Sequence, residues 1–182
     1  MSKLSRISSG DWSILNVKIS NKTLEEMIRE SAIEEDFNAG VFFEVKGEFP
    51  FVAMIVFRPK DIEIVSKCFL GYSLARIGAL SNVEELMLSE LGNIIVNSFI
   101  GSLSNLMSTT FLPSVPKCIQ GPRNSILEAF ETMLLKTARH TIINVFMEMK
   151  YCQLNSKCDI VAVVPENLEK AIISQIRPDN NF

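Results

Sequence analysis

The chain has 182 residues, of which 47% are apolar and 21% charged, with a formal net charge of −3. This composition excludes a disordered chain, and the absence of a basic footprint gives no sign of a nucleic-acid partner. The length suits one domain, 1–182, with its own core. The polar start lacks the apolar segment of a secretory signal, and no apolar run reaches the ~18–20 residues of a membrane span. We therefore expect a cytoplasmic protein without membrane insertion.

Cysteine and histidine usage gives no metal site. The four cysteines are Cys68, Cys118, Cys152 and Cys158, and none forms a CxxC pair. We expect buried thiols in a reducing compartment, not a disulfide framework or a zinc site. The single His140 cannot alone build a metal site or a catalytic triad, so we expect a structural residue where a strand begins.

The first part of the chain predicts a helix, two strands and a second helix. Thr23 to Glu26 fits a capping box at the start of an amphipathic helix. Residues 41–46 predict a strand, and the nearly continuous apolar run 51–57 predicts one that is buried on both faces. Pro59 follows, and residues 61–71 have a helical pattern.

The longest helical pattern lies in the middle of the chain. A capping box from Ser81 to Glu84 opens it, and the pattern continues to about Met107. A predicted buried stripe comprises Leu88, Leu91, Ile95, Phe99 and Leu106. A second face carries Glu85, Ser89, Glu90, Asn93, Asn97, Gly101 and Ser104. At ~100° per residue, Glu90 and Asn93 point within ~60° of each other and can contact one common object.

This second face has few charges. Between Glu90 and Lys117 no charged residue occurs, although a solvated helix face usually carries Lys or Glu. A small, neutral polar stripe fits close approach by a partner protein, and it equally fits packing within the same chain. The pattern alone leaves both readings open.

The order seen before the central helix returns after it. Ser125 to Glu128 fits another capping box, residues 145–150 and 159–164 predict strands, and residues 166–176 predict a helix. At one offset of 104 residues, the matching pairs are Val41 with Val145, Glu44 with Glu148 and Lys46 with Lys150. We interpret this as an internal duplication of a helix–strand–strand–helix unit, approximately 14–70 and 118–176, around the central helix 82–107. A chance likeness of two hairpins is the alternative, and agreement at three elements disfavours it.

The central motif resembles that of a known family. The stretch "ELGNIIVN" is followed by "LPSVP", with twenty-two residues between Asn93 and Pro116. A Glu, an Asn three residues later and a Pro at this spacing are similar to the motif of the CheC/CheX family of chemotaxis phosphatases. The similarity in element order covers roughly residues 14–176. It implies an α/β (α+β) fold with pseudo-two-fold symmetry, in which an antiparallel sheet carries long helices on one face.

The resemblance also implies a reaction. The substrate would be the aspartyl phosphate of a CheY-like response regulator, which supplies its own divalent cation, so no cofactor or metal is expected in this chain. Hydrolysis needs a water held in line with the scissile P–O bond, and catalysis is mainly positioning and electrostatics. A carboxamide offers a donor and an acceptor without net charge. The expected roles are Asn93 for orienting the water, Glu90 for engaging a basic group on the receiver, and Pro116 for shaping the turn after the helix.

Three features depart from the family pattern. Leu86 stands where the family usually has Ser or Asp, and Asn97 stands where Gly is common. Asn97 would crowd the docking receiver or supply a second amide, with Ser89 as a further accessory residue. The chain also holds one motif helix where related proteins often hold two. Residues Ser31 to Asn38 fit the Ser-x-x-x-Glu-x-x-Asn spacing of the family motif better than the central helix does. We assign this match to chance, because Asp61 stands where the Pro of the motif should be, and residues 38–40 fit a helix stop before a strand.

Two classes of function remain open. The first is a phosphatase acting on a phosphorylated receiver, favoured by Glu90, Asn93 and Pro116. The second is a non-catalytic adaptor of the same fold that binds a receiver, a CheD-like deamidase or a flagellar switch partner, favoured by Leu86 and Asn97. The lack of a further domain beyond Phe182 counts against a switch component. An exposed edge strand makes a homodimer plausible. For Glu90 and Asn93, the alternative is a structural pair that caps a neighbouring loop.

Overall fold

The computed structural model describes residues 12–20, 23–31, 37–71, 79–132, 140–151 and 153–176. The polar start, Cys152 and most of the chance match after Ser31 lie outside these ranges.

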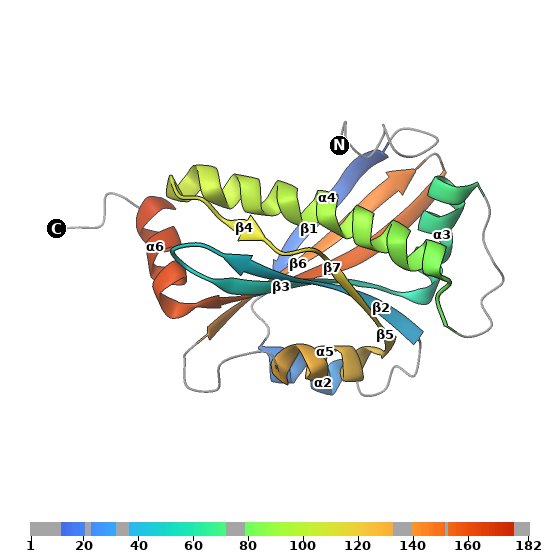
Figure 1. Cartoon of the computed structure of the whole chain (residues 1–182), viewed down its shortest axis with the longest axis horizontal. Helices are drawn as coiled ribbons and strands as arrows, with labels where there is room; N and C mark the ends of the chain where they lie inside the picture. The colour runs from blue at the N-terminus through green and yellow to red at the C-terminus, as the bar shows by residue number, and fades with distance from the viewer. Residues whose placement is uncertain are drawn as a thin grey trace.

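One antiparallel sheet of seven strands forms the centre of the described structure (Figure 1). The strands are β1 (Trp12–Ser20), β2 (Phe37–Lys46), β3 (Phe51–Phe57), β4 (Leu112–Pro113), β5 (Lys117–Pro122), β6 (His140–Tyr151) and β7 (Leu154–Pro165). Their order is β1-β6-β7-β3-β2, with β4 and β5 each paired to β2 at the far edge. The hairpins β2–β3 and β6–β7 therefore meet at the β3–β7 pair in the middle of the sheet.

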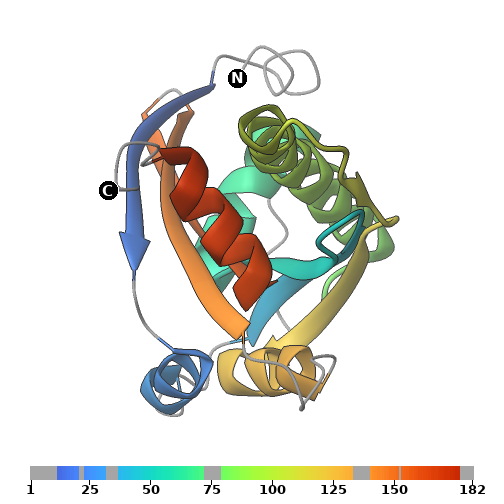
Figure 2. The ribbon, with the colours of Figure 1, turned by 90° about the vertical axis from the view of Figure 1, so that its left-hand side faces the viewer.

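Helices cover both faces of this sheet (Figures 1 and 2). One face carries α3 (Pro59–Leu70), α4 (Asn82–Met107) and α6 (Glu166–Ile176). The opposite face carries α2 (Leu24–Ser31) and α5 (Arg123–Thr132), which pack side by side. The predicted fold class is confirmed, and a second helical layer on the opposite face is added to it.

Alternation along the strands explains the two layers. In β3, Ala53 and Ile55 face the α4 side, whereas Met54 and Val56 face the α2–α5 side, and all four are buried. A strand covered on both faces needs apolar residues at every position, which accounts for the continuous run 51–57.

The helix–strand–strand–helix order occurs twice, as α2–β2–β3–α3 and α5–β6–β7–α6. Ile55 pairs with Ile160, and Val56 pairs with Asp159. Val41 pairs with Ile55 in the first hairpin, and its repeat equivalent Val145 pairs with Ile160 in the second. Ile55 and Ile160 are therefore repeat equivalents that pair directly with each other at the β3–β7 junction. The pseudo-two-fold axis therefore passes through the centre of the sheet.

Helix starts confirm two of the three predicted capping boxes. Thr23 and Glu26 bond reciprocally through side chain and backbone, and so do Ser81 and Glu84. The third prediction is wrong, because α5 begins at Arg123 and places Ser125 inside the helix. The chain enters α5 directly from β5, and the Arg123 side chain is held by Asp159 Oδ2 at 2.6 Å and by Ser31 Oγ at 3.1 Å.

Residues 38–40 are not a helix stop. They belong to β2 and pair with both β3 and β5. A Cβ at Gly40 would lie 2.9 Å from Ile126 Cγ2 and 3.0 Å from Met54 Sδ. The glycine therefore provides room for α5 to approach the sheet, which is a long-range requirement that local sequence does not reveal.

The thiols and the histidine are placed largely as expected. Cys68 and Cys158 are buried and Cys118 is half-buried, and all three are free thiols. His140 is the first residue of β6 and pairs with Pro165 at the end of β7, which confirms its position at a strand start.

Candidate functional site

The helix α4 is the element that positions the predicted site. Its 26 residues begin after the Ser81 cap and end at Ser108, which adopts a left-handed conformation with φ 50°. Its length and mean hydropathy would also suit a membrane span. Its apolar side is instead buried against the sheet, as in the core helix of a globular protein.

The predicted buried stripe of α4 is confirmed in its first part. Leu88, Leu91 and Ile95 are buried, whereas Phe99 is half-buried against the core and Leu106 is 39% exposed. The last residue of α4 that is buried is Leu103, so the final turn of the helix extends beyond the covered part of the core.

Gly92 sets the distance between α4 and β2. A Cβ at this position would lie 2.8 Å from Val41 Cγ1 and 3.2 Å from Val41 Cβ. The backbone of α4 thus rests almost directly on the β2 side chains, one residue before Asn93. This close contact fixes how far Asn93 projects above the sheet.

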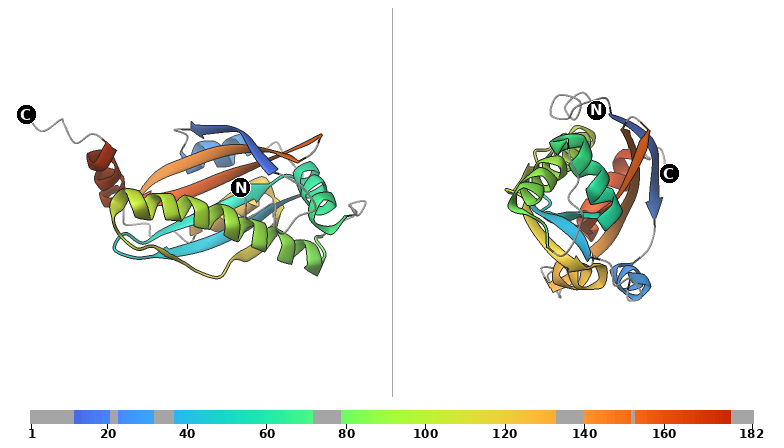
Figure 3. Two further views of the ribbon diagram at one scale, coloured as in Figure 1. Left: turned by 90° about the horizontal axis from the view of Figure 1, so that it is seen from above. Right: turned by 90° about the vertical axis from the view of Figure 1, so that its right-hand side faces the viewer.

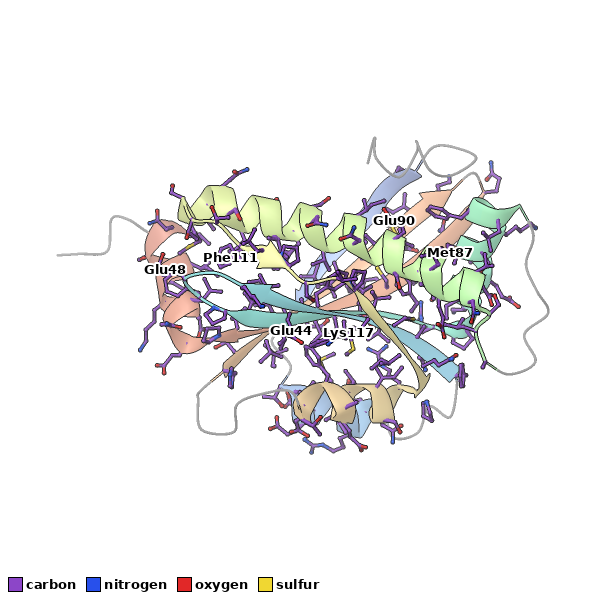
Figure 4. The ribbon with its side chains drawn as sticks, in the orientation of Figure 1. Glu44, Glu48, Met87, Glu90, Phe111 and Lys117 are labelled. Carbon is purple, nitrogen blue, oxygen red and sulfur yellow. The ribbon has the colours of Figure 1, made fainter. Side chains whose placement is uncertain are left out.

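The segment after α4 turns back beside the helix and joins the sheet edge (Figures 1 and 3). Ser114 N donates to Glu44 O at 2.7 Å, and Glu44 N donates to Ser114 Oγ at 3.1 Å, so this segment is bound to β2. Lys117 Nζ lies 3.4 Å from Glu44 Oε1, an exposed ion pair at the sheet edge (Figure 4). Pro116 stands between β4 and β5, immediately before the first residue of β5.

Gln120 connects this edge back to the start of α4. Its Oε1 accepts from Leu80 N at 2.8 Å, and its Nε2 donates to Glu85 Oε1 at 3.3 Å. Sequence reasoning missed Gln120, because the bond joins residues 35 positions apart and no local pattern marks it. Nearby on β5, burial and then the Glu85 carboxylate raise the pKa of the Cys118 thiol to about 11.

Glu90, Asn93 and Asn97 lie together on the outer side of α4. Glu90 and Asn97 are exposed, and Asn93 is half-buried (Figure 4 for Glu90). Residues three or four apart on a helix have Cβ atoms about 5–6 Å apart, so Asn93 is a neighbour of both. Within the described residues Glu90 forms no hydrogen bond or ion pair. The pair is therefore not turned into the core.

Asn97 is bonded to Asn93. Its Nδ2 donates to Asn93 Oδ1 at 2.7 Å. Neither side chain caps a described loop. Ser89, the other predicted accessory residue, is half-buried one turn before Asn93 and has no side-chain hydrogen bond within the described residues.

Apolar side chains are exposed on the same helix and on the segment that follows it. Leu86, one turn before Glu90, is 72% exposed, and Val83 is exposed one turn earlier. On the returning segment, Val115 is 83% exposed. Among the described residues, no group of three or more His, Cys, Asp or Glu is arranged to hold a metal ion. The arrangement can present a carboxylate and two carboxamides, bordered by apolar contacts, to a macromolecule.

Comparison with known proteins identifies the fold. No family model matches the sequence, and no curated protein matches it. Among solved structures, FliY from Thermotoga maritima is similar with a TM-score of 0.65 at 17% identity, covering 98% of this chain and 88% of that one. The chemotaxis protein CheX from Desulfovibrio desulfuricans has a TM-score of 0.54 at 13% identity, covering 90% and 91%. A chain of the FliG–FliM complex from H. pylori has a TM-score of 0.57 at 12% identity, covering 95% and 88%.

These similarities confirm, at the level of the fold, the resemblance to CheC/CheX-like proteins. A CheC-like protein from a Shewanella species, with a TM-score of 0.52 at 12% identity, has the same fold.

Proposed function

We propose that this chain is a cytoplasmic phosphatase that accelerates hydrolysis of the aspartyl phosphate of a CheY-like response regulator in chemotaxis signalling. The observation that carries the proposal is the outward placement of Glu90 and Asn93 on α4, at the motif spacing that the sequence shares with CheC/CheX phosphatases. The fold shared with a CheX structure supports the same proposal.

The geometry suits hydrolysis of a phosphoryl group that is bound to a partner protein. The chain needs no deep pocket of its own, since the phosphoryl group and its divalent cation would arrive on the receiver. Asn93 is held half-buried on a helix whose backbone rests on β2 through Gly92. A group fixed in this way loses little freedom when it orients a water molecule, which is the main contribution that positioning makes to catalysis.

Glu90 has the complementary role. As an exposed carboxylate without an ion-pair partner in the described structure, it is available to a basic group on the receiver. A pair of this kind fixes orientation and raises the association rate more than it adds affinity. Leu86, one turn earlier, would supply apolar contact area beside it.

The second candidate is an adaptor of the same fold. It is favoured by the exposed Leu86 at a position where the family usually has a polar residue, and by Asn97, whose side chain occupies space beside Asn93. Similarity to FliY and to a chain of the FliG–FliM complex makes a flagellar switch partner a further candidate. A CheD-like partner and a homodimer stay predictions. The edge strand β1, which pairs only with β6 among the described strands, is where a second copy would add to the sheet.

A dephosphorylation assay separates the two candidates. A CheY-like receiver domain from the same organism is phosphorylated with acetyl phosphate in Mg²⁺, and its decay is followed with wild-type protein, Asn93→Ala and Ser102→Ala. Ser102 is an exposed α4 residue that bonds only to its own helix, so it provides the matched control. The proposal expects faster decay with wild type and Ser102→Ala, and intrinsic decay with Asn93→Ala. Saturable binding with unchanged decay would establish the adaptor instead.

A further inference from the structure

The amide–amide contact on α4 carries an inference about the side chain that departs from the family pattern. Asn97 is joined to Asn93 by a hydrogen bond of 2.7 Å from its Nδ2 to Asn93 Oδ1. Asn97 itself is exposed, and no other hydrogen bond fixes it among the described residues. Its one polar contact is therefore with the residue proposed to orient the water.

The contact determines which way the Asn93 amide faces. The terminal torsion of an asparagine is broad and nearly two-fold, so an unsupported carboxamide exchanges its oxygen and nitrogen positions easily. In this structure Asn97 donates to Oδ1, and while that hydrogen bond is made Asn93 keeps Oδ1 toward Asn97 and Nδ2 away from it. The Asn93 Nδ2 has no other partner within the described residues, and Oδ1 retains a second lone pair.

This orientation presents two different groups at once. The remaining lone pair of Oδ1 can accept a hydrogen bond from the attacking water, and the Nδ2 group can donate a hydrogen bond to a phosphoryl oxygen. The reverse orientation would exchange these groups and mismatch both. We propose that Asn97 is a positioning residue that locks the carboxamide of Asn93 in its productive orientation. This inference rests on the proposed phosphatase function and specifies how its site is held.

The surroundings leave room for such a role. A Cβ at Gly101, one turn beyond Asn97, would meet no atom of the described residues within 4 Å, so the helix face next to Asn97 is open there. Asn97 thus supports Asn93 from one side without closing the side from which a receiver would approach. Asn97 stands at a position where the family commonly has Gly, and a Gly there would have no side chain to hold Asn93.

Two substitutions test the lock. Asn97→Ala removes the donor and raises helix propensity, so the variant should stay folded. Loss of one orienting hydrogen bond corresponds to about a five-fold decrease in kcat of receiver dephosphorylation. Asn97→Asp offers only acceptors and would attract Asn93 Nδ2, which reverses the amide. Its kcat should fall further, toward that of Asn93→Ala.

The added charge of aspartate needs its own control. Gly101→Asp places a carboxylate on the same face without contact to Asn93, and its effect should appear in KM and weaken at high salt. The kcat effect of Asn97→Asp should persist at high salt. Wild-type kcat in both Asn97 variants, alongside a loss in Asn93→Ala, would overturn the lock while leaving the phosphatase function standing.

A second readout does not depend on activity. In ¹⁵N-labelled protein, the side-chain amide protons of Asn97 should lie at hydrogen-bonded shifts and should move toward free-amide values in Asn93→Ala. Unchanged Asn97 shifts in that variant would overturn the inference. A wild-type protein that does not accelerate receiver decay would refute the proposed function and this inference together.

Discussion

Asn93 and Asn97 hold each other in place at the candidate site through their side chains. A carboxamide in mid-helix is a poor helix former that competes for backbone partners. Here the two carboxamides share one hydrogen bond of 2.7 Å, and Glu90 lies beside them on the same helix. The polar group is thus held by side chains of one helix and depends on the sheet only through Gly92.

Leu86 provides a prediction about binding. Because this side chain is largely exposed, Leu86→Ala should leave the free energy of unfolding unchanged to within ~0.5 kcal/mol. If it packs against the receiver, its truncation should raise KM by about ten-fold and leave kcat within two-fold. Steady-state dephosphorylation kinetics measure both constants. An unchanged KM would exclude Leu86 from the interface.

Cys118 provides a prediction about reactivity. Burial and the neighbouring Glu85 hold its pKa at about 11, so at pH 8 the thiol is almost entirely protonated. Only the thiolate reacts, and alkylation by iodoacetamide should be about a hundred-fold slower than for an unperturbed cysteine. The rate should increase roughly ten-fold per pH unit up to about pH 11.

Peptide mass spectrometry follows the labelling of Cys118, with the same protein in guanidinium chloride as the reference. A rate that reaches its plateau below pH 9 would contradict the raised pKa.

Residue identities at the site were predictable from the sequence, but their contacts were not. Spacing along one helix is local information, so Glu90 and Asn93 could be placed on a common face. The bonds that Gln120 makes to Leu80 and Glu85 join β5 to α4, and only the folded topology brings these residues together. Pro116 was expected in a turn after the helix, and it lies in the connection between β4 and β5, directly before the strand that pairs with β2.

Among elements, the contact between α4 and β2 has the largest influence on the site. Gly92 lets the helix backbone approach Val41, and Gly101 lies on the same helix in open surroundings. The two glycines therefore form an internal comparison. Replacement by alanine raises helix propensity at both positions, but only at Gly92 would the new methyl group clash with a neighbouring side chain, that of Val41.

Gly92→Ala should destabilise the protein, and Gly101→Ala should stabilise it. A new methyl group 2.8 Å from the stiff Val41 side chain forces α4 away from the sheet, at a cost of about 1–3 kcal/mol. At Gly101 the substitution should contribute up to about 1 kcal/mol of stability. Urea denaturation measures both. Equal stabilisation by the two substitutions would show that α4 does not rest on β2 through Gly92.

Elements with strong local signals were predicted best. The run 51–57 and the box at Ser81 fall within the boundaries of β3 and α4. The strands β1, β4 and β5 were not predicted, since edge strands are specified by pairing partners distant in the chain. The start of α5 was misplaced because Ser125 satisfies a capping pattern that the ion pair of Arg123 with Asp159 overrides.

At the scale of the whole molecule, the two repeats share one sheet and its cores. The buried residues of both hairpins belong to the same clusters on each face, and β3–β7 pairing runs through the centre. The single long helix α4 and the edge formed by β4 and β5 belong to the link between the repeats. The 104-residue offset in the sequence predicted the internal repeat. The pairing of β3 with β7, which joins the two repeats into one sheet, could not be predicted from it.

Shared cores predict cooperative unfolding. Neither repeat can expose its half of the β3–β7 pair without breaking the clusters of the other, so thermal unfolding should be one transition. Far-UV circular dichroism reports on both halves, and tryptophan fluorescence is a second, independent probe of unfolding. The two curves should coincide. Separate midpoints would show that the repeats unfold independently.

The rate of receiver dephosphorylation tests most directly whether the outer face of α4 carries chemistry. A CheY-like receiver carrying an aspartyl phosphate and Mg²⁺ is mixed with increasing amounts of wild-type protein, and the release of inorganic phosphate is recorded over time. We predict a decay rate that rises with protein concentration, saturates, and returns to the intrinsic value when Asn93 is replaced by alanine. A decay rate identical with and without the wild-type protein, at concentrations where binding is complete, would contradict the assignment of chemistry to the outer face of α4.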